Sequence, residues 1–586
     1  MVTTFAVLTW LSAGAAPEQD PAPKVEGYAK ERVREKLDRG LVAVRLDGGG
    51  VYLSWRLFAR DPAGLAFNVY RKTEVDPRGA KINAEPLRGA TSCLDTPPAG
   101  AAGLSYALAT VLDGREESCP GAPAFAASAG LKNAGCVTLR LQGGHTFQKA
   151  GIADLDGDGR LDFVLKQPDD NIDPYVKYWT RSPDTYKLEA YAHDGRFLWR
   201  HDLGWAIERG IWYSPYLVYD LDGDGRAEVA VKTGEGDPRD PDGKVTQGPE
   251  YLTILDGRTG APVTRIDWIP RAKFTGESGY NYASRNQLHV AYLDGKTPCL
   301  IVHRGTYNVM FATAYEYRGG ALRELWRWSN EGAGRQCQGQ GAHWMHCADV
   351  DGDGRDEVVL GSLVLDDDGT LLWTTGLGHP DHCYAGDIDP ELPGLEIYYG
   401  IEPGRDRNTM CLVEARTGRI IWGHEGKTAH IHSSGLCGDI DASRPGAECY
   451  SGERDFADKR WLRDCKGNVI GTQDLGGLAP RSACFDADAQ RELIRGNRVI
   501  DFGGAEVAAG IEGRVVAVAD ILGDWREEII TSVKGELRIY TTAIPAAVRH
   551  PCLLDDPLYR SDVAGAAMGY YQVPMTSYDL ERRMAR

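Results

Sequence analysis

The chain has 586 residues and a formal net charge of −18 at pH 7. Its length favours one large repeat domain together with a smaller domain, and its acidic excess disfavours nucleic acids and anionic membranes as partners. Glycine is abundant (71 residues), methionine is scarce (7 residues) and long apolar helical patterns are few. We therefore expect a turn-rich, all-β protein.

The first residues, MVTTFAVLTWLSAGAAPEQD, have the pattern of a secretory signal peptide. An apolar run from Phe5 to Leu11 is followed by Ala13 and Ala15, which form a small-x-small cleavage pattern. We expect residues 1–16 to be a signal peptide and the protein to be secreted, either extracellular or periplasmic. Because no Lys or Arg precedes the apolar run, an N-terminus without a targeting role is the alternative. No later stretch reaches the length of a membrane-spanning helix.

Residues 28–127 form the first expected domain. Short alternating segments separated by turn residues, GLVAVRLDGGGVYLSWRLF, AFNVYRKT and LSYALATVLDG, predict a small β-sandwich of the fibronectin III-like kind. The segment that follows, CPGAPAFAASAG at residues 119–130, has the composition of a linker.

One unit, a strand followed by an acidic turn and a second strand, recurs from residue 131 to residue 586. It is clearest in GIADLDGDGRLDFVL, YDLDGDGRAEVAV and ADVDGDGRDEVVL, and weaker in AYLDGKTPCLIV, GDIDPELPGLEIYY, GDIDASRPGAECYS, CFDADAQRELI and ADILGDWREEII. Eight such units, each with room for four strands, predict an eight-bladed β-propeller. Because the spacing is irregular, a long β-helix or a row of separate modules is the alternative.

The thirteen cysteines are scattered and include no C-x-x-C pair. They therefore predict neither a disulfide framework nor a zinc site. Cys347, Cys437 and Cys449 lie in apolar strand patterns, so we expect them to be core residues.

The acidic turns have the spacing of calcium loops. Acids at positions 1, 3, 5 and 9 with Gly at position 6 can converge on one cation, and hard oxygen ligands suit Ca²⁺. The predicted calcium ligands are Asp154, Asp156, Asp158 and Asp162; Asp220, Asp222, Asp224 and Glu228; and Asp349, Asp351, Asp353 and Glu357. The alternative is that these are solvated Asp-Gly turns without metal.

A second set of residues should lie at the other end of the same hairpins. Six strand residues span roughly 20 Å, so a side chain that far from a turn faces the opposite side of the disc. Basic and metal-ligating side chains recur there: Lys166, Lys232, Arg304, His343, His379, Asp381, Glu402 and His432. Such a face suits an anionic ligand and a further metal ion, although a lone Lys at a strand end is often only solvated.

Three long segments resemble the rhamnogalacturonan lyases of polysaccharide lyase family 11. They are NQLHVAYLDGKTPCLIVHRGTY, GQGAHWMHCADVDGDGRDEVVLGSLVLDDDGTLLWTTGLGHPDH and ADILGDWREEIITSVKGELRIYTT, and the likeness covers nearly everything after the signal peptide. The resemblance implies an eight-bladed propeller with many bound Ca²⁺ ions. It also implies β-elimination in the pectin backbone of alternating rhamnose and galacturonate.

The resemblance extends to the site, with departures. His343, His379, Asp381 and Glu402 match the positions that hold a calcium ion in the family's cleft, Tyr570 in MGYYQVP matches a substrate-contacting tyrosine, and Asn171 lies in a substrate-binding segment. The family's Asn-Gly-Thr-Lys segment is here AAGIEGRVV, where Arg514 is the remaining cation. A cleft arginine of the family is here Ser434, so the substrate or the linkage can differ.

The elimination that the resemblance implies needs three kinds of group. A cation must stabilise the charge that develops beside the uronate carboxylate, a base must remove H-5, and an acid can protonate O-4. We expect these roles to fall on Lys232, Arg304, His432, Arg514 and Tyr570, with Lys166 and Asn171 binding substrate. His432 and Lys232 are the candidates for the base. We expect the enzyme to be a monomer that acts on rhamnogalacturonan I.

Two other classes of protein remain open. One is a carbohydrate-binding propeller without activity, which the departures at Ser434 and Arg514 allow. The other is a glycoside hydrolase that uses a carboxylate pair such as Glu402 and Glu453.

Overall fold

The computed structural model describes residues 32–123, 130–276 and 278–584, so the expected signal peptide lies outside the described residues. Strands dominate this part of the chain, and the all-β expectation is confirmed. None of the helices in the described ranges is long and apolar enough to cross a membrane.

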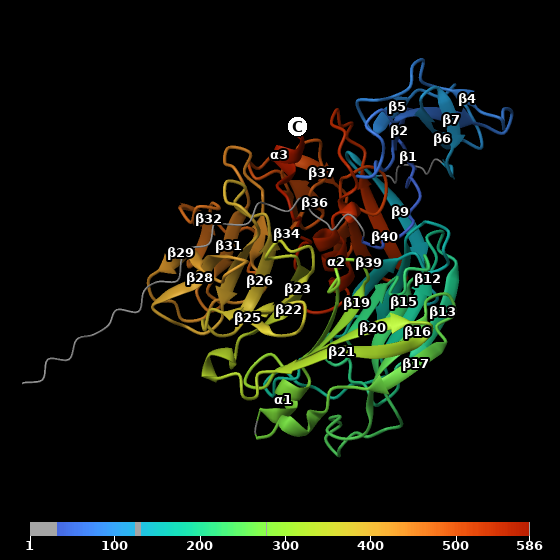
Figure 1. Cartoon of the computed structure of the whole chain (residues 1–586). Coiled ribbons are helices and arrows are strands. Elements are labelled where there is room, and N and C mark those ends of the chain that lie inside the picture. Colours follow the sequence, from blue (N-terminus) through green and yellow to red (C-terminus); the bar gives the residue numbers. More distant parts are fainter. Residues whose placement is uncertain (1–31, 124–129, 277, 585–586) are drawn as a thin grey trace, which may run out of the picture.

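Two small sheets form a separate lobe at the N-terminal end, drawn in blue in Figure 1. One sheet contains β1 (Val42–Arg45), β2 (Val51–Ser54) and β5 (Ser92–Asp95). The other contains β4 (Ala80–Lys81), β3 (Ala66–Lys72), β6 (Ser105–Leu112) and β7 (Arg115–Ser118), and β8 (Ala122–Pro123) pairs with β6. Trp55, Phe67 and Tyr106 are buried in a core that the two sheets share, so the lobe has its own hydrophobic centre.

Eight four-stranded antiparallel sheets make up the rest of the described chain. The first four are β10 (Lys149–Ala153), β11 (Asp162–Gln167), β12 (Lys187–Tyr191) and β13 (Phe197–Asp202); β14 (Tyr216–Tyr219), β15 (Glu228–Gly234), β16 (Glu250–Asp256) and β17 (Pro262–Asp267); β18 (Asn286–Ala291), β19 (Cys299–Arg304), β20 (Phe311–Arg318) and β21 (Ala321–Ser329); and β22 (Gly341–Ala348), β23 (Glu357–Gly361), β24 (Leu363–Leu365) and β25 (Leu371–Thr374).

The other four sheets follow the same order of strands along the chain. They are β26 (Pro380–Gly386), β27 (Glu396–Ile401), β28 (Arg407–Glu414) and β29 (Ile420–Glu425); β30 (Leu436–Gly438), β31 (Glu448–Gly452), β32 (Arg460–Arg463) and β33 (Val469–Gly471); β34 (Arg481–Ala483), β35 (Glu492–Arg495), β36 (Arg498–Ile500) and β37 (Glu506–Ala509); and β38 (Arg514–Ala519), β39 (Glu528–Val533), β40 (Glu536–Thr542) and β9 (Ala134–Arg140).

The last sheet takes its outer strand from the beginning of the repeat region. β9 pairs antiparallel with β40, with Ala134 opposite Thr542 and Arg140 opposite Glu536. The first strands of neighbouring sheets touch one another: β10 contacts β14, β14 contacts β18, β18 contacts β22, β22 contacts β26, and β38 contacts both β34 and β10.

A short helix, α2 (Pro557–Gly565), lies among the first strands of the sheets. It contacts β10, β14, β18 and β22, and its residues from Leu558 to Gly565 are all buried. Within this packing, Asp562 accepts a hydrogen bond from His346 at 2.8 Å. Burial opposes the charge of His346, but the Asp562 carboxylate overrides it and raises the pKa of the imidazole to about 10.

The remaining helices are short and lie outside the sheets. They are α1 (Gly279–Ala283), α3 (Leu580–Met584) and the 3₁₀ turns η1 (Arg271–Lys273), η2 (Arg335–Cys337) and η3 (Leu553–Asp555). All thirteen cysteines are free, and Cys347, Cys437 and Cys449 are buried in the core as expected.

Candidate functional site

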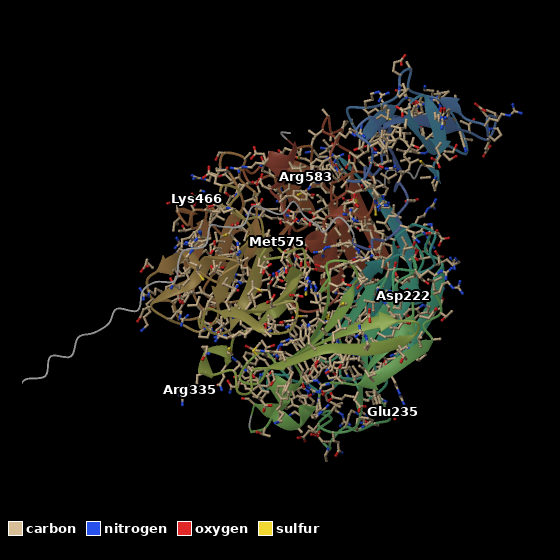
Figure 2. All side chains as sticks on the ribbon, viewed as in Figure 1. Asp222, Glu235, Arg335, Lys466, Met575 and Arg583 are labelled. Carbon is tan, nitrogen blue, oxygen red and sulfur yellow. The ribbon has the colours of Figure 1, made fainter. Side chains whose placement is uncertain are left out.

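The acidic turns and the other predicted residues lie at opposite ends of the same hairpins. Each turn joins the first strand of a sheet to the second, and the second strand then runs to the far end, as β15 does from Glu228 to Gly234. Figure 2 shows Asp222 in the second turn and Glu235, just after β15, at opposite ends of this sheet. The connections that leave the far ends form the face that we call the cleft face.

The three full acidic turns share one hydrogen-bond pattern. Asp154 accepts from the backbone N–H of Gly157 and of Gly159, both at 2.7 Å, and Asp220 and Asp349 repeat this pattern at 2.8 and 2.9 Å. The acid that begins the next strand accepts from the residue after the first acid, as Glu228 does from Leu221 at 2.9 Å.

Each full turn gathers carboxylates into a group that could hold a cation. Ligand atoms of at least three predicted acids lie within 4.8 Å of one another in every turn: Asp154, Asp156 and Asp162; Asp220, Asp222 and Glu228; and Asp349, Asp351 and Asp353. The remaining predicted ligands, Asp158, Asp224 and Glu357, lie in the same turns.

Burial and mutual repulsion make these acids reluctant to ionise. Burial raises the pKa values of Asp154, Asp220 and Asp349 to about 6 each. Burial and the neighbouring Asp carboxylates raise the pKa of Glu228 to about 8 and that of Glu357 to about 10. Glu357 Oε1 is buried without a hydrogen-bond partner. Crowded, buried oxygens with spare lone pairs are what a hard cation takes as ligands, so the residues fit Ca²⁺.

Two of the weaker turns carry their own cation instead. Lys466 Nζ lies 2.7 and 2.9 Å from the two carboxylate oxygens of Asp389 in the fifth turn. In the eighth turn, Arg526 pairs with Asp524 at 2.8 Å. A side-chain charge therefore supplies at these turns the neutralisation that a metal would supply at the three full turns.

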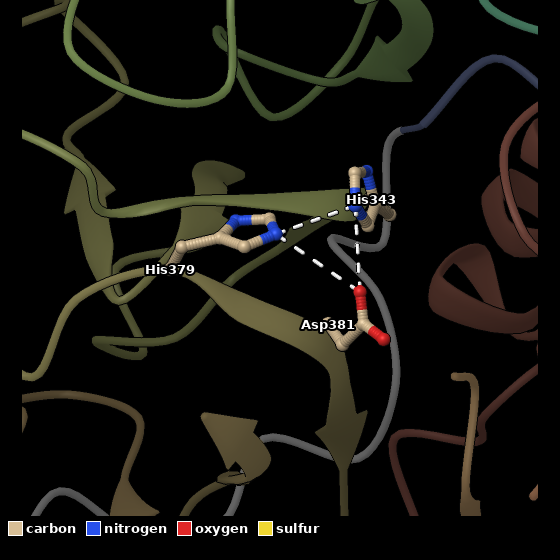
Figure 3. A group of neighbouring side chains, drawn as sticks. All are labelled: His343, His379 and Asp381. Atoms are coloured by element: carbon tan, nitrogen blue, oxygen red, sulfur yellow. Dashed lines mark hydrogen bonds and ion pairs between the residues drawn. The ribbon is translucent and has the colours of Figure 1, made fainter. Parts of the chain in front are cut away.

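On the cleft face, His343, His379 and Asp381 form a buried cluster, shown in Figure 3. The Nε2 atoms of the two histidines are 3.3 Å apart, and His343 Nε2 is 3.4 Å from Asp381 Oδ1. His379 Nδ1 donates to the Gly341 carbonyl, which fixes the tautomer and leaves the Nε2 lone pair directed into the cluster. Asp381 Oδ1 is buried without a hydrogen-bond partner. The His379 lone pair, the neighbouring His343 Nε2 and a carboxylate oxygen without a hydrogen-bond partner fit a divalent cation.

A second layer, closer to solvent, adjoins this cluster. Glu402 lies 3.5 Å from His379 Nε2 and 3.1 Å from His430 Nε2, and His432 Nδ1 lies 2.8 Å from Asp381 Oδ2. Although burial opposes charge at both members of this pair, the hydrogen bond between them raises the pKa of His432 and lowers that of Asp381. The structure thus brings together all five of these predicted residues and adds His430.

Aromatic rings line the cluster. The ring centroids of Tyr570 and Trp212 are 4.7 and 4.9 Å from that of His343, and Tyr307 lies 4.7 Å from His379. Tyr570 is therefore placed beside the cluster, and burial raises the pKa of its hydroxyl, so it is a neutral hydrogen-bond donor at neutral pH.

Lys232 and Arg304 do not join the histidine cluster. They surround the buried carboxylate of Glu250, with Lys232 Nζ at 2.6 Å and an Arg304 nitrogen at 2.7 Å, and Arg271 binds the same carboxylate at 2.7 Å. Burial lowers the pKa of Lys232 to about 8. The Glu250 carboxylate therefore holds both side chains away from the histidine cluster in this structure.

Lys166 belongs to a different basic group, formed with Lys149, Arg481 and Arg514. Lys166 and Lys149 are opposite each other on β11 and β10, and burial lowers the pKa of Lys149 to about 7, with Arg481 and Arg514 adding to this effect. Hydrogen bonds from the basic group go to backbone carbonyls, such as Lys149 Nζ to Met568 and Arg514 to Phe147. No ion pair to a described carboxylate neutralises any of the four, in a chain whose net charge is −18.

The sequence reasoning missed Lys149 and Arg481, although a signal was available for Lys149. Lys149 pairs with Lys166, four residues after Asp162, and Arg514 pairs with Ser532, four residues after Glu528, so Lys149 and Arg514 share a repeat position on the incoming strands. Arg481 pairs with Ile494, two residues after Glu492, and occupies a different position. Asn171, the other predicted substrate-binding residue, accepts a hydrogen bond from the Ile211 backbone at 3.2 Å on the cleft face.

Comparison with known proteins identifies the family. The model of the rhamnogalacturonan lyase family 11 C-terminal domain matches residues 142–586, and that of the rhamnogalacturonan I lyase beta-sheet domain matches residues 32–122. The chain belongs to rhamnogalacturonan lyase family 11. It is therefore a polysaccharide lyase.

Relatives of this family 11 lyase match it over nearly its full length. Rhamnogalacturonan endolyase YesW of Bacillus subtilis (strain 168) is 36% identical over 615 residues, which cover 96% of this chain and 93% of the relative. Rhamnogalacturonan exolyase YesX of the same organism is 34% identical over 616 residues, covering 95% and 97%. The crystal structure of exotype YesX superposes with a TM-score of 0.86 at 32% identity, covering 95% of this chain and 98% of that chain. The Bacillus licheniformis rhamnogalacturonan lyase gives a TM-score of 0.83 at 33% identity with the same coverage.

Proposed function

We propose that this lyase is secreted and cleaves the rhamnose-(1→4)-galacturonate bond of rhamnogalacturonan I, in pectin, by metal-assisted β-elimination. The observation that carries this proposal is the buried cluster of His343, His379 and Asp381, beside Glu402, in a chain that matches its lyase relatives over nearly their whole length. The product is an unsaturated uronate at the new non-reducing end.

The architecture that we propose is an eight-bladed β-propeller preceded by a small β-sandwich. The eight four-stranded sheets would be the blades, the contacts between first strands would form the ring, and β9 would close it. The sandwich would correspond to the two sheets that share the Trp55 and Phe67 core. We further propose that the enzyme is a monomer.

His343 Nε2, His379 Nε2, Asp381 Oδ1 and Glu402 Oε2 are the atoms that would hold a divalent cation, for which we propose Ca²⁺. Bound there, the cation would offset the substrate carboxylate and the charge that develops on removal of H-5. Carboxylates suit Ca²⁺, whereas imidazole nitrogens also suit transition metals, so metal analysis of the purified protein decides the identity of the ion.

The proton transfers are assigned from the electrostatics of the side chains. His432 has a raised pKa because Asp381 stabilises its charged form, which favours the role of acid toward O-4 over that of base. Lys232 is held by Glu250 at 2.6 Å. Lys149 has a pKa of about 7 and no carboxylate partner among the described residues, so we propose that its neutral amine removes H-5, with Arg514 and Tyr570 orienting the sugars.

A hydrolase mechanism is disfavoured by the surroundings of Glu453. This carboxylate is fully buried, and it already accepts from Lys459 at 3.0 Å and from the Ala429 backbone at 3.1 Å. It therefore lacks the access to water and substrate that the second carboxylate of a hydrolase needs.

The deciding experiment is to incubate the purified protein with rhamnogalacturonan, with and without a chelator. A rise in the ultraviolet absorbance of unsaturated uronates, lost on chelation and restored by the metal, is the expected result. New reducing ends without that absorbance would show hydrolysis, and binding without either product would show a carbohydrate-binding propeller. Either of these two outcomes would refute the proposal.

A further inference from the structure

Exposed apolar side chains concentrate on two loops of the cleft face. Nine large hydrophobic residues are exposed among the described residues, and four of them lie on these loops: Tyr175 (46% exposed), Val176 (76%), Tyr178 (54%) and Phe456 (43%). We call Tyr175, Tyr178 and Phe456 the aromatic rim. Exposed aromatic side chains that cluster in this way mark interaction sites, because an isolated soluble chain gains nothing from leaving them in water.

Both loops leave their sheets at the end opposite the acidic turns. The loop with Tyr175 and Tyr178 follows β11, which starts at Asp162 directly after the first turn. The loop with Phe456 follows β31, which starts at Glu448 directly after the sixth turn. The rim therefore lies on the same face as the histidine cluster.

The turn that carries the two tyrosines is rigid. Asp173 accepts from the Tyr175 backbone N–H at 2.7 Å, and the Tyr175 carbonyl accepts from the N–H groups of Tyr178 and Trp179, both at 2.9 Å. Trp179 Nε1 donates to the buried carboxylate of Glu208 at 2.8 Å. The rings of Tyr175 and Tyr178 meet edge to face at 5.8 Å. A ligand that stacks on them would pay little ordering entropy, because the turn is already formed.

A chain of contacts joins this turn to the histidine cluster. Asp173 forms an ion pair with Arg285 at 2.9 Å, the Arg285 guanidinium lies 5.2 Å from the ring centroid of Trp212, and Trp212 packs 4.9 Å from His343. A run of packed side chains therefore connects the turn of the rim to the cluster.

The Phe456 loop is also joined to the residues around the cluster. The backbone N–H of Arg454 donates to the His430 carbonyl at 3.0 Å. The Arg454 side chain interacts electrostatically with both Tyr178 and Glu402. Arg454 therefore lies near the other loop and near the second layer of the site.

A lysine accompanies an exposed ring on each loop. Lys177 Nζ lies 5.4 Å from the ring centroid of Tyr178, and Lys459 Nζ lies 4.3 Å from that of Phe456. An aromatic face next to an ammonium group offers an apolar surface and a positive charge side by side. A polymer that alternates a neutral sugar with a uronate presents the complementary pair, an apolar ring face followed by a carboxylate.

We propose that the aromatic rim is a substrate subsite that binds sugar units of rhamnogalacturonan beyond the cleaved bond. The rings of Tyr178 and Phe456 stack on neutral sugars, and Lys177 neutralises an adjoining uronate. The inference rests on the proposed function for the identity of the polymer. It adds that the enzyme binds a long polysaccharide more tightly than a short one.

The test compares a Tyr175→Ala, Tyr178→Ala double variant with wild type on the long polymer and on an oligosaccharide too short to reach the rim. The expected result is a rise in KM of about tenfold on the polymer, with kcat unchanged and with no change on the oligosaccharide. A Tyr175→Phe, Tyr178→Phe variant keeps both rings and should behave like wild type. Val263→Ala, at an exposed residue outside the two loops, serves as the matched surface control.

Affinity electrophoresis in a gel containing the polymer separates this inference from the proposed function. A wild type that is retarded by the polymer but releases no unsaturated product would refute the proposed lyase activity and leave the subsite standing. Equal retardation and equal KM for wild type and the alanine variant would overturn the subsite. Loss of self-association in the alanine variant, measured by light scattering, would overturn it as well, because the rim would then be a contact between copies of this chain.

Discussion

Replacing Glu228 by Gln should stabilise the protein in the absence of calcium, and calcium should remove most of that difference. Without calcium, burial and the neighbouring Asp222 and Asp220 carboxylates raise the pKa of Glu228 from 4.5 to about 8. The folded state therefore binds a proton more readily than the unfolded state, and the stability of the calcium-free protein is highest below about pH 4.5 and falls up to about pH 8. Gln carries no charge, so the variant does not lose this stability as the pH rises.

The pKa shift of Glu228 sets the stability that the calcium-free protein loses as the pH rises. A shift of this size lowers the free energy of unfolding by about 3–5 kcal/mol above pH 8. With an unfolding entropy of ~2.1 cal/mol/K per residue over about 450 residues, 1 kcal/mol moves the Tm by about 1 °C. The variant should then melt about 3–5 °C above wild type in excess chelator at pH 8.

Calcium should close most of this gap. A ligand at a hundred times its Kd stabilises the folded state by about 2.7 kcal/mol, and a neutral amide in place of a carboxylate weakens this site. Wild type should therefore gain about 2–3 °C in excess calcium and the variant much less, so that the two proteins melt within about 2 °C of each other.

Thermal unfolding followed by circular dichroism at pH 8, in chelator and in calcium, measures both differences. Glu528→Gln is the matched control, because the eighth turn carries Arg526, which pairs with Asp524 at 2.8 Å. The calcium response of this control should equal that of wild type. A Glu228→Gln variant that melts below wild type in both media would refute the reasoning, because the carboxylate would then be stabilising without a metal.

Three further substitutions test the cleft face and helix α2. His379→Ala should remove one divalent ion per chain, by elemental analysis, and lower kcat by at least about 100-fold, whereas Glu528→Gln should keep both; unchanged metal content would contradict the assignment. Lys149→Gln should lower kcat by about 10²–10⁴-fold. Wild-type activity should rise with pH through about 7, where the Lys149 amine loses its proton. An unaltered pH profile in the variant would exclude Lys149 as the base. Asp562→Asn should cost about 3–5 kcal/mol in the free energy of unfolding by denaturant at pH 7. Because the pKa of His346 is raised to about 10, the stability from the His346–Asp562 pair is complete below pH 6.5 and lost toward pH 10. An equal cost at pH 6.5 and at pH 10 would contradict the pairing.

The repeat could be recognised in the sequence because its acidic residues accept hydrogen bonds from the backbone. Asp154 and Asp220 accept hydrogen bonds from their own turns, so each hairpin needs the same residues at the same spacing. Counting along the strands from these turns correctly placed His343 and His379 on one face. The positions of these residues follow from strand geometry, which is local.

The ion pairs of Lys232 and Arg304 could not be predicted from the sequence in the same way. Glu250, which pairs with Lys232 and Arg304, lies on β16 and has no counterpart in the repeat pattern. Its pair with Lys232 lies within one sheet, but its pair with Arg304 depends on how neighbouring sheets pack, which is a tertiary property. Lys149 was overlooked for the opposite reason: it shares a visible repeat position with Arg514, but Lys and Arg residues were compared only on the outgoing strands.

The pairing of β9 with β40 has a consequence for how this protein is made. Residues 134–140 emerge from the ribosome some 400 residues before residues 536–542, their partners in the final sheet. Until those partners are synthesised, β9 presents an unpaired edge that could associate with another chain. Completion of this sheet must therefore wait for the end of translation, and a truncation before residue 536 would leave the other seven four-stranded sheets present but this one without β40 and its pairing with β9.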